Sequence, residues 1–291
     1  MFKLYYKHLY PSIIEWQDEP FAPWSFKEQV LLNVLPFFES TLLKEEFSLK
    51  KEIGCEIFMD SGAFTAASMG YELDPYEVAE MQALLKADLV VPVDKVVFRE
   101  DSYRIVNQKI EDTISNTEIL LDLKHKTSQV IGPLQGFTKE ILEHSFNEFK
   151  KLGIQRFAIS GLVFESEIKR NMERIALTRE ITKGYPLHIF GKFLHPELLK
   201  LIIDANTDSV DGYGCIIASL KGNYIFNGTY ESISDLTDDE IDLCSCSICQ
   251  ENSYENLSRV DKESQHLLII HNIIALNNLK EELLKQKSNQ H

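Results

Sequence analysis

Three aspartates of this sequence, Asp60, Asp94 and Asp211, each follow a short apolar run. Paired carboxylates suit chemistry at an anomeric carbon, because one can attack as a nucleophile while the other moves protons. A single aspartate after a strand is more often an ordinary turn or helix-cap residue. Three of them at equivalent places, together with Gln135 after another apolar run, favour one shared reactive site with Asp211 as its most reactive member.

The apolar runs alternate with amphipathic segments, which is the pattern of a parallel sheet covered by helices. Because the carboxyl ends of parallel strands meet at one edge, the residues that follow the strands are expected to lie together. The expected strands are residues 57–59, 88–93, 129–134, 155–160, 186–190 and 209–210. The expected helices are residues 26–46, 76–87, 103–124, 138–152, 165–182, 196–205 and 262–285.

A chain of 291 residues, 44% of them hydrophobic, can form one large domain with a small appendage. The predicted fold is α/β, a TIM (β/α)8-type barrel at residues 1–232. A small C-terminal zinc-binding subdomain at residues 233–291 is expected to comprise a knuckle and a terminal helix packed on the barrel. The sequence contains no glycine-rich phosphate fingerprint, which counts against a nucleotide-cofactor fold.

Three of the five cysteines, Cys244, Cys246 and Cys249, fall within six residues. Three thiolates and the imidazole of His271 would satisfy tetrahedral Zn²⁺ with no open position, so a structural Zn²⁺ is predicted. His266 is the rival fourth ligand; five residues along a helix turn through about 140°, so only one of the two histidines can face the knuckle. The alternative is a loop of reduced cysteines. His188 and His195, which flank one strand end, are interpreted as structural residues.

The net charge of −15 argues against a protein that coats nucleic acid, although it leaves room for a local basic groove. No stretch approaches the roughly 18 consecutive apolar residues of a membrane helix. The N-terminus lacks the apolar core of a signal peptide. The expected location is therefore the cytoplasm, or the host cytoplasm if a phage encodes the chain, with no membrane partner.

Several motifs occur together in an order that resembles the queuine/archaeosine tRNA-guanine transglycosylase superfamily, over roughly residues 55–275. The zinc signature followed by His271-Asn272 is the most specific of them. The others are Asp60-Ser61-Gly62-Ala63-Phe64, Leu134-Gln135-Gly136, Ser160-Gly161-Leu162, His188-Ile189-Phe190-Gly191 and the Asp208/Asp211 pair.

The resemblance implies a zinc-containing TIM barrel and a pentosyltransferase that replaces guanine in a polynucleotide with a free 7-deazaguanine base. It implies that Asp211 is the nucleophile that forms a covalent intermediate and that Asp60 serves in proton transfer. Asp94 and Gln135 match positions that bind the edge of the base. Gly161 and Leu162 match positions that line its pocket through backbone groups.

The chain departs from the tRNA enzymes after Asp211, where bacterial members carry Thr-Arg and a basic run. Here residues 212–217 are uncharged, and Lys221 is the first basic residue. We therefore favour the branch that modifies DNA, with tRNA modification of the queuosine or archaeosine type as the alternative. A non-catalytic zinc-binding partner subunit and a barrel glycosidase are lesser alternatives. A homodimer, or a partner protein that grips nucleic acid, is a further expectation.

Overall fold

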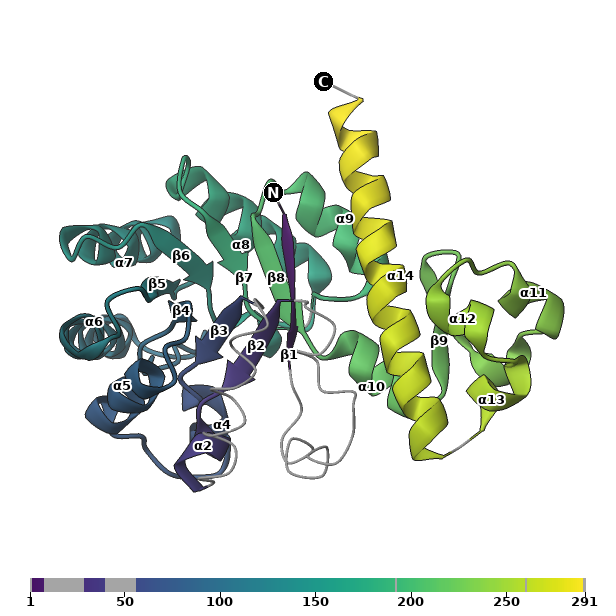
Figure 1. Cartoon of the computed structure of the whole chain (residues 1–291). Coiled ribbons are helices and arrows are strands. Elements are labelled where there is room, and N and C mark those ends of the chain that lie inside the picture. Colours follow the sequence, from purple (N-terminus) through teal and green to yellow (C-terminus); the bar gives the residue numbers. More distant parts are fainter. Residues whose placement is uncertain (1, 8–28, 40–55, 192, 260, 290–291) are drawn as a thin grey trace. The chain divides into compact units, whose positions relative to one another are not determined.

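The computed structural model describes residues 2–7, 29–39, 56–191, 193–259 and 261–289 (Figure 1). Two compact units make up the chain. The first contains Met1–Gly191 and Thr207–Asp211, and the second contains Lys192–Asn206 and Gly212–His291. None of the helices in the described ranges combines the length and the apolar character that crossing a bilayer requires.

A closed barrel of parallel strands forms the first unit, which confirms the predicted fold class. Its interior is filled by a cluster of side chains that includes Tyr5, Leu31, Phe58 and Ile131. The strands, in their order around the barrel, are β1 (Lys3–Lys7), β2 (Val30–Asn33), β3 (Ile57–Asp60), β4 (Leu89–Val90), β5 (Gln129–Leu134), β6 (Arg156–Ile159), β7 (Leu187–Ile189) and β8 (Ser209–Gly212).

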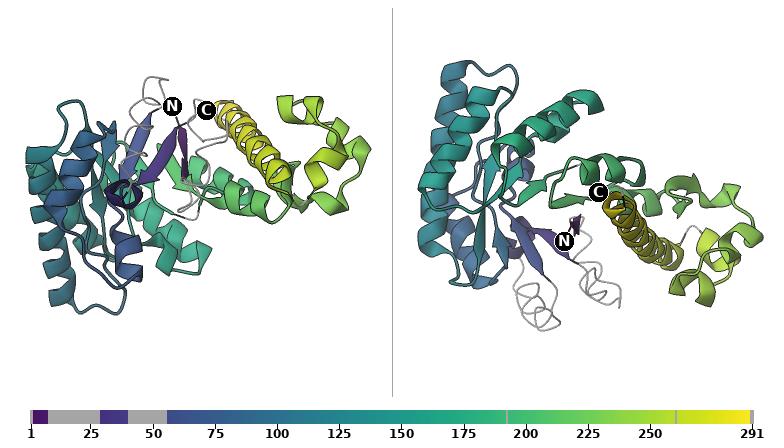
Figure 2. Two further views of the ribbon diagram at one scale, coloured as in Figure 1. Left: turned by 60° about the horizontal axis from the view of Figure 1, so that its bottom comes forward. Right: turned by 90° about the horizontal axis from the view of Figure 1, so that it is seen from above.

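Helices follow the strands and cover the outside of the barrel (Figure 2). Two of them begin at side chains that commonly cap helices: the Asp74 carboxylate accepts from the Tyr76 N–H at 2.8 Å, and Thr138 caps the helix after β5. The helices of this unit are α2 (Leu35–Glu39), α4 (Ala63–Ser68), α5 (Pro75–Leu84), α6 (Tyr103–Leu123), α7 (Lys139–Lys151), η2 (Leu162–Phe164) and α8 (Ile168–Ile181).

The predicted helix over residues 26–46 is wrong where the structure describes it. Val30–Asn33 is strand β2, paired with β1 and β3, and a separate short helix begins at Leu35. Val30, Leu31 and Leu32 are all fully buried, and a short run that is apolar on every side suits a central barrel strand as well as a helix face. Lys3–Lys7 forms strand β1, which was not among the strands expected from the sequence.

The parallel register fixes one row of residues at the carboxyl edge of the barrel. Leu134 pairs with Ile159 on the next strand, Ile159 with Ile189, and Ile189 with Val210. The residues that follow this row are Gln135, Ser160, Phe190 and Asp211. Four residues that are far apart in the sequence therefore reach the same level of the barrel.

The second unit contains a β-hairpin and several helices. The hairpin turns at Asn227 and Gly228, whose φ angles of 47° and 81° suit a tight two-residue turn. Its elements are α9 (Pro196–Asp204), α10 (Gly214–Leu220), β9 (Asn223–Phe226), β10 (Thr229–Ser232), η3 (Ile233–Asp235), α11 (Asp238–Asp242), α12 (Ser247–Glu251), α13 (Tyr254–Ser258) and α14 (Lys262–Ser288). The domain division at residue 232 stays a prediction, while the hairpin groups with the second compact unit.

Candidate active site and metal centre

Asp211 is a fully buried carboxylate near the end of β8. Its Oδ1 accepts hydrogen bonds from the Gly191 N–H at 2.9 Å and from Nε2 of His188 at 3.2 Å. Its Oδ2 has no hydrogen-bond partner among the described residues. A buried carboxylate oxygen without a partner is rare and is typical of functional sites, so Oδ2 is the oxygen available for chemistry.

His188 lies beside this carboxylate, although the sequence suggested only a structural role. Its Nδ1 lies 2.8 Å from Oγ of Ser209, and its ring packs edge-on against Phe58 and Phe190 at centroid distances of 5.0 and 4.7 Å. The motif around His188 was visible in the sequence, but its polar partners were not. They lie on the neighbouring strand, β8, and become visible only through the pairing of β7 with β8.

A second carboxylate, Asp94, is held by two side chains from neighbouring strand ends. Its Oδ2 accepts from Nε2 of Gln135 at 2.7 Å and from Oγ of Ser160 at 3.0 Å. The other end of the Gln135 amide accepts from the Val97 N–H at 2.5 Å. The structure thus brings Asp94 and Gln135 together, as their positions after β4 and β5 predict.

Burial raises the pKa of Asp94 to about 6, and the nearby negative charge of Asp60 adds to the increase, against the hydrogen bonds from Ser160 and Gln135. Asp60 ends β3 and therefore acts on the same part of the barrel mouth. After it, Gly62 adopts φ 76°, and a Cβ there would lie 2.6 Å from Oδ1 of Asn33. The glycine of the Asp60-Ser61-Gly62 sequence is therefore required by local packing.

Gly161 also has a left-handed conformation, with φ 76°, and Leu162 after it is fully buried. The Ser160 carbonyl accepts from Nη2 of Arg174 at 2.6 Å, which holds the backbone at the start of this turn. Arg174 is itself buried, and this burial lowers its pKa to about 10. The turn places the two residues directly after β6, at the carboxyl edge of the barrel.

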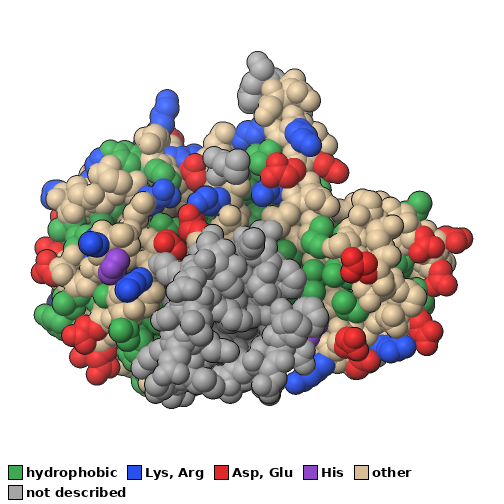
Figure 3. Space-filling view, in the orientation of Figure 1, with side chains coloured by type: hydrophobic (Ala, Val, Ile, Leu, Met, Phe, Trp, Pro, Cys, Tyr) green, Lys and Arg blue, Asp and Glu red, His purple; other side chains and the backbone are tan. Residues whose placement is uncertain are grey.

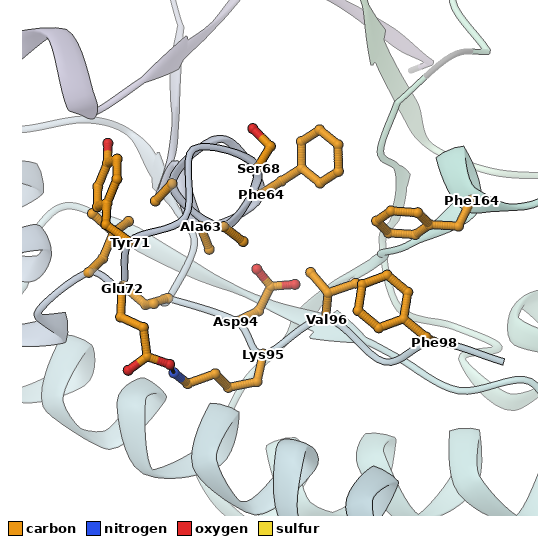
Figure 4. A pocket seen from close by; sticks show the side chains of 14 residues that line it. Ala63, Phe64, Ser68, Tyr71, Glu72, Asp94, Lys95, Val96, Phe98 and Phe164 are labelled. Atoms are coloured by element: carbon orange, nitrogen blue, oxygen red, sulfur yellow. Dashed lines mark hydrogen bonds and ion pairs between the residues drawn. The ribbon is translucent and has the colours of Figure 1, made fainter. Parts of the chain in front are cut away.

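A pocket of about 420 Å³ opens beside Asp94 (Figure 4). Phe64, Phe98 and Phe164 come from three separate segments, and the ring of Phe164 meets the other two edge to face, with centroids 4.9 Å from Phe98 and 5.6 Å from Phe64. A carboxylate among apolar walls and aromatic rings suits a flat polar ring system. Among the predicted site residues that the structure describes, Asp94 lines this pocket, whereas Asp60, Gln135, Gly161, Leu162 and Asp211 are not part of its lining.

Cys244, Cys246, Cys249 and His271 form the cluster predicted from the sequence. Each offers one ligand atom, and these atoms all lie within 4.8 Å of one another. Nδ1 of His271 lies 3.9, 3.3 and 3.4 Å from the three sulfur atoms in order. The rival ligand, His266, is not a member of the group, so the four side chains could hold a metal ion with His271 as the nitrogen ligand.

The cluster fits a metal ion by its chemistry as well as its geometry. Nε2 of His271 lies 3.1 Å from the Ile225 carbonyl oxygen, which fixes the proton there and leaves Nδ1 as a lone pair facing the thiols. Hydrogen bonds with Cys246 and Cys249 hold the pKa of Cys244 far below its usual value, while those with Cys244 and Cys246 raise the pKa of Cys249. Three thiols this close together suit a cation, which would hold them as thiolates.

Asn272, next to His271 on α14, attaches the hairpin to the helix that carries the metal ligand. Its Oδ1 accepts from the Ile225 N–H at 2.7 Å, and its Nδ2 donates to the Asn223 carbonyl at 2.9 Å and to Oγ of Ser219 at 2.8 Å. The ring of Tyr224 stacks on that of His271 at 3.7 Å. In the His271-Asn272 pair, His271 thus belongs to the candidate metal site and Asn272 forms hydrogen bonds with β9.

Comparison with known proteins identifies a family that fits this geometry. The family model described as queuine tRNA-ribosyltransferase matches residues 42–286. The tRNA-guanine(15) transglycosylase of Pyrobaculum aerophilum is 28% identical over 244 residues, which cover 81% of this chain and 48% of the relative. That of Methanosarcina barkeri is 27% identical over 228 residues, or 75% of this chain and 45% of the relative.

The queuine tRNA-ribosyltransferase of Clostridium botulinum is 22% identical over 237 residues, which cover 72% of this chain and 61% of the relative. The chain spans about half the length of the archaeal relatives it matches. The family match, in contrast, extends over most of this chain. The chain therefore belongs to the queuine tRNA-ribosyltransferase family.

Proposed function

We propose that the chain is a guanine transglycosylase that replaces guanine in tRNA with a 7-deazaguanine base through a covalent intermediate on Asp211. The observation that carries this proposal is the Asp211 carboxylate, with Oδ1 held by two donors and Oδ2 left without a partner among the described residues. Each relative named above carries tRNA in its name, which favours the tRNA alternative over the DNA substrate that the sequence suggested.

The reaction divides into two displacements at C1′ of the target nucleoside. Oδ2 of Asp211 attacks C1′, the C1′–N9 bond breaks with its electron pair going to guanine, and guanine takes up a proton as it leaves. The incoming base then loses its N9 proton, N9 attacks C1′, and the Asp211 carboxylate is released. Asp60 is the group proposed to deliver and accept these protons, which balance over the cycle.

Base recognition would rest on Asp94 and its neighbours. A carboxylate accepts from both the N1–H and the N2 amino group of guanine, which a carboxylic acid does less well. The Gln135 amide nitrogen gives one hydrogen to Asp94, so its second hydrogen is available for the O6 oxygen of the base. Gly161 and Leu162, which follow β6 at the same edge of the barrel, are proposed to contact the base through their backbone groups. A 7-deazaguanine keeps the same recognition edge, so one site can serve both the leaving and the entering base.

The metal proposed for the cysteine cluster is Zn²⁺. Three sulfur ligands and one nitrogen ligand fill a tetrahedral site, so the ion would have a structural role in the second unit. A homodimer, or a partner protein that grips nucleic acid, also stays a prediction. On the face shown in Figure 3, the Lys and Arg side chains of the described residues lie singly or in small groups among acidic and neutral ones, which suits that prediction.

The test incubates the protein with a labelled 7-deazaguanine and either total tRNA or duplex DNA, side by side. We expect incorporation into tRNA and a denaturant-stable adduct that Asp211→Asn lacks. Asp204→Asn is the matched control, because Asp204 is an exposed helix carboxylate paired with Lys200. Incorporation into DNA alone would overturn the tRNA assignment. Incorporation into neither polymer would overturn the enzyme proposal in favour of a non-catalytic subunit.

A further inference from the structure

We infer that His188 and Ser209 act together as positioning residues for the Asp211 nucleophile, an inference that rests on the proposed function of Asp211. Neither residue carries an assigned role in the reaction proposed above. Their contacts with each other and with Asp211 form a continuous chain, Ser209–His188–Asp211, which we call the Ser209 relay.

Strand register creates the relay. His188 on β7 is the direct partner of Ser209 on β8. Side chains two residues apart on one strand point to the same face, so Ser209 and Asp211 lie on the same side of β8. The imidazole of His188 is long enough to reach both, with Nδ1 2.8 Å from Oγ of Ser209 and Nε2 3.2 Å from Oδ1 of Asp211.

The partners determine where the imidazole carries its proton. An ionised carboxylate can only accept, so the hydrogen must be on Nε2 of His188. Nδ1 of a neutral ring is then an acceptor, and the Ser209 hydroxyl is the donor that faces it. The ring is 3% exposed and packs against Tyr5, Phe58 and Phe190, which hold its orientation. Asp211 thus selects the tautomer, and the Ser209 hydroxyl satisfies the Nδ1 nitrogen that this tautomer leaves as an acceptor.

The relay gives the two oxygens of Asp211 different roles. With Nε2 of His188 and the Gly191 N–H both on Oδ1, the carboxylate cannot rotate, and Oδ2 keeps the direction of attack. The same two donors face the oxygen on which negative charge returns when Asp211 leaves C1′ in the second displacement. The relay should therefore affect formation and breakdown of the covalent intermediate, rather than binding of the free base.

The test measures single-turnover adduct formation with tRNA in wild type, His188→Phe, His188→Gln and Ser209→Ala. We expect His188→Phe to slow adduct formation about 100-fold, the usual scale for loss of one oriented donor. The KM for the free base should stay within about twofold of wild type. His188→Gln should recover about tenfold of that loss, because a side-chain amide can also donate to Oδ1. Ser209→Ala, which leaves the ring in place, should cost about fivefold.

His195→Phe is the matched control, because His195 is the other histidine that flanks this strand end. Its ring contacts Tyr230 within the second unit, and its adduct rate should equal that of wild type. Nitrogen-15 spectra of the imidazoles give a readout that is independent of activity. His188 should show the Nε2–H tautomer in wild type, and its Nδ1 resonance should shift in Ser209→Ala, because that nitrogen loses its hydrogen-bond donor.

Adduct formation by His188→Phe within about twofold of wild type would overturn the inference, as would an Nδ1–H tautomer at His188 in wild type. If His188→Phe fails to fold, the rate and the spectrum of Ser209→Ala still decide. A wild-type protein that forms no adduct with tRNA or DNA would instead overturn the proposed function. In that case the imidazole spectra alone decide whether the relay exists.

Discussion

Gln135 donates a 2.7 Å hydrogen bond to Oδ2 of Asp94 and is itself held by the backbone of Val97. Since Gln135 is buried and both ends of its amide are engaged, the orientation of the amide is fixed with its nitrogen toward the carboxylate. The end of β5 is thereby tied to the segment after β4. Asp94 is held in place without a ligand, which would reduce the ordering required by the base binding proposed above.

Replacing Gln135 by Leu should therefore affect both stability and base binding. The change leaves the Val97 N–H without an acceptor and removes a donor from Asp94, at a cost of about 1–3 kcal/mol in the free energy of unfolding. The KM for the free base should rise about tenfold. Urea denaturation and the base-exchange assay measure the two effects. Gln155→Leu, at an exposed glutamine, is the control; equal stability of the two variants would contradict the role of Gln135.

The raised pKa of Asp94 predicts an acidic limit to base binding. The carboxylate, which is the form that accepts from N1–H and N2–H, is lost as the pH falls through about 6. The KM for the free base should therefore increase below pH 6, whereas Asp94→Asn should bind weakly at every pH. If the wild-type KM for the free base stays constant between pH 5 and pH 7, this prediction is wrong.

The raised pKa of Asp94 also makes the free energy of unfolding depend on pH. The pKa of Asp94 is about 6 in the folded protein and near the ordinary aspartate value of 3.8 in the unfolded chain, so the folded protein binds more protons between these values. Its contribution to stability is fully present below about pH 4 and is lost as the pH rises through about 6. Relative to wild type, Asp94→Asn should thus gain on the order of 2–3 kcal/mol over this range. Urea titrations of both proteins at pH 4, 5, 6 and 7 give the difference.

Loss of the metal site should lower the stability of the second unit. Cys246→Ser removes one of three sulfur ligands, so we expect loss of bound zinc and earlier thermal unfolding of that unit, because metal binding energy is folding energy. Metal analysis and proteolysis of the C-terminal region measure both. Cys215→Ser is the control: Cys215 lies outside the cluster, and burial raises its pKa to about 12, so zinc content should not change. Wild-type zinc content in Cys246→Ser would exclude this cysteine as a ligand.

Asn272→Ala should loosen β9 without removing a metal ligand. The change deletes one acceptor and two donated hydrogen bonds at a fully buried position, for a loss of about 2–4 kcal/mol. Amide exchange at Ile225 should accelerate while zinc content is retained. Asn278→Ala, at an exposed residue of the same helix, should change stability by less than about 0.5 kcal/mol. Equal exchange rates at Ile225 in the two variants would argue against the role of Asn272.

The sequence predicted the elements whose signals are local. Asp74 and Thr138 mark helix starts, the cysteine spacing predicts the cluster with His271, and Asp94 and Gln135 follow their strands. The helix predicted over Val30–Asn33 is wrong because a short, fully apolar run has no periodicity that distinguishes a strand from a helix. The β9–β10 hairpin carries a local signal of its own, the Asn227-Gly228 pair at its turn. His188 could not be assigned, since its partners lie 21 and 23 residues away and depend on the β7–β8 register.

The shared level of Gln135, Ser160, Phe190 and Asp211 has a consequence for how this chain can change in length. The number of residues along each strand determines which side chain reaches the barrel mouth. A single inserted or deleted residue within β8 would therefore replace the Asp211 carboxylate by the side chain of a neighbour. An insertion after the strand ends leaves that count intact. Natural variation in length should thus be confined to the connecting loops, where relatives can gain or lose segments while the row of side chains persists.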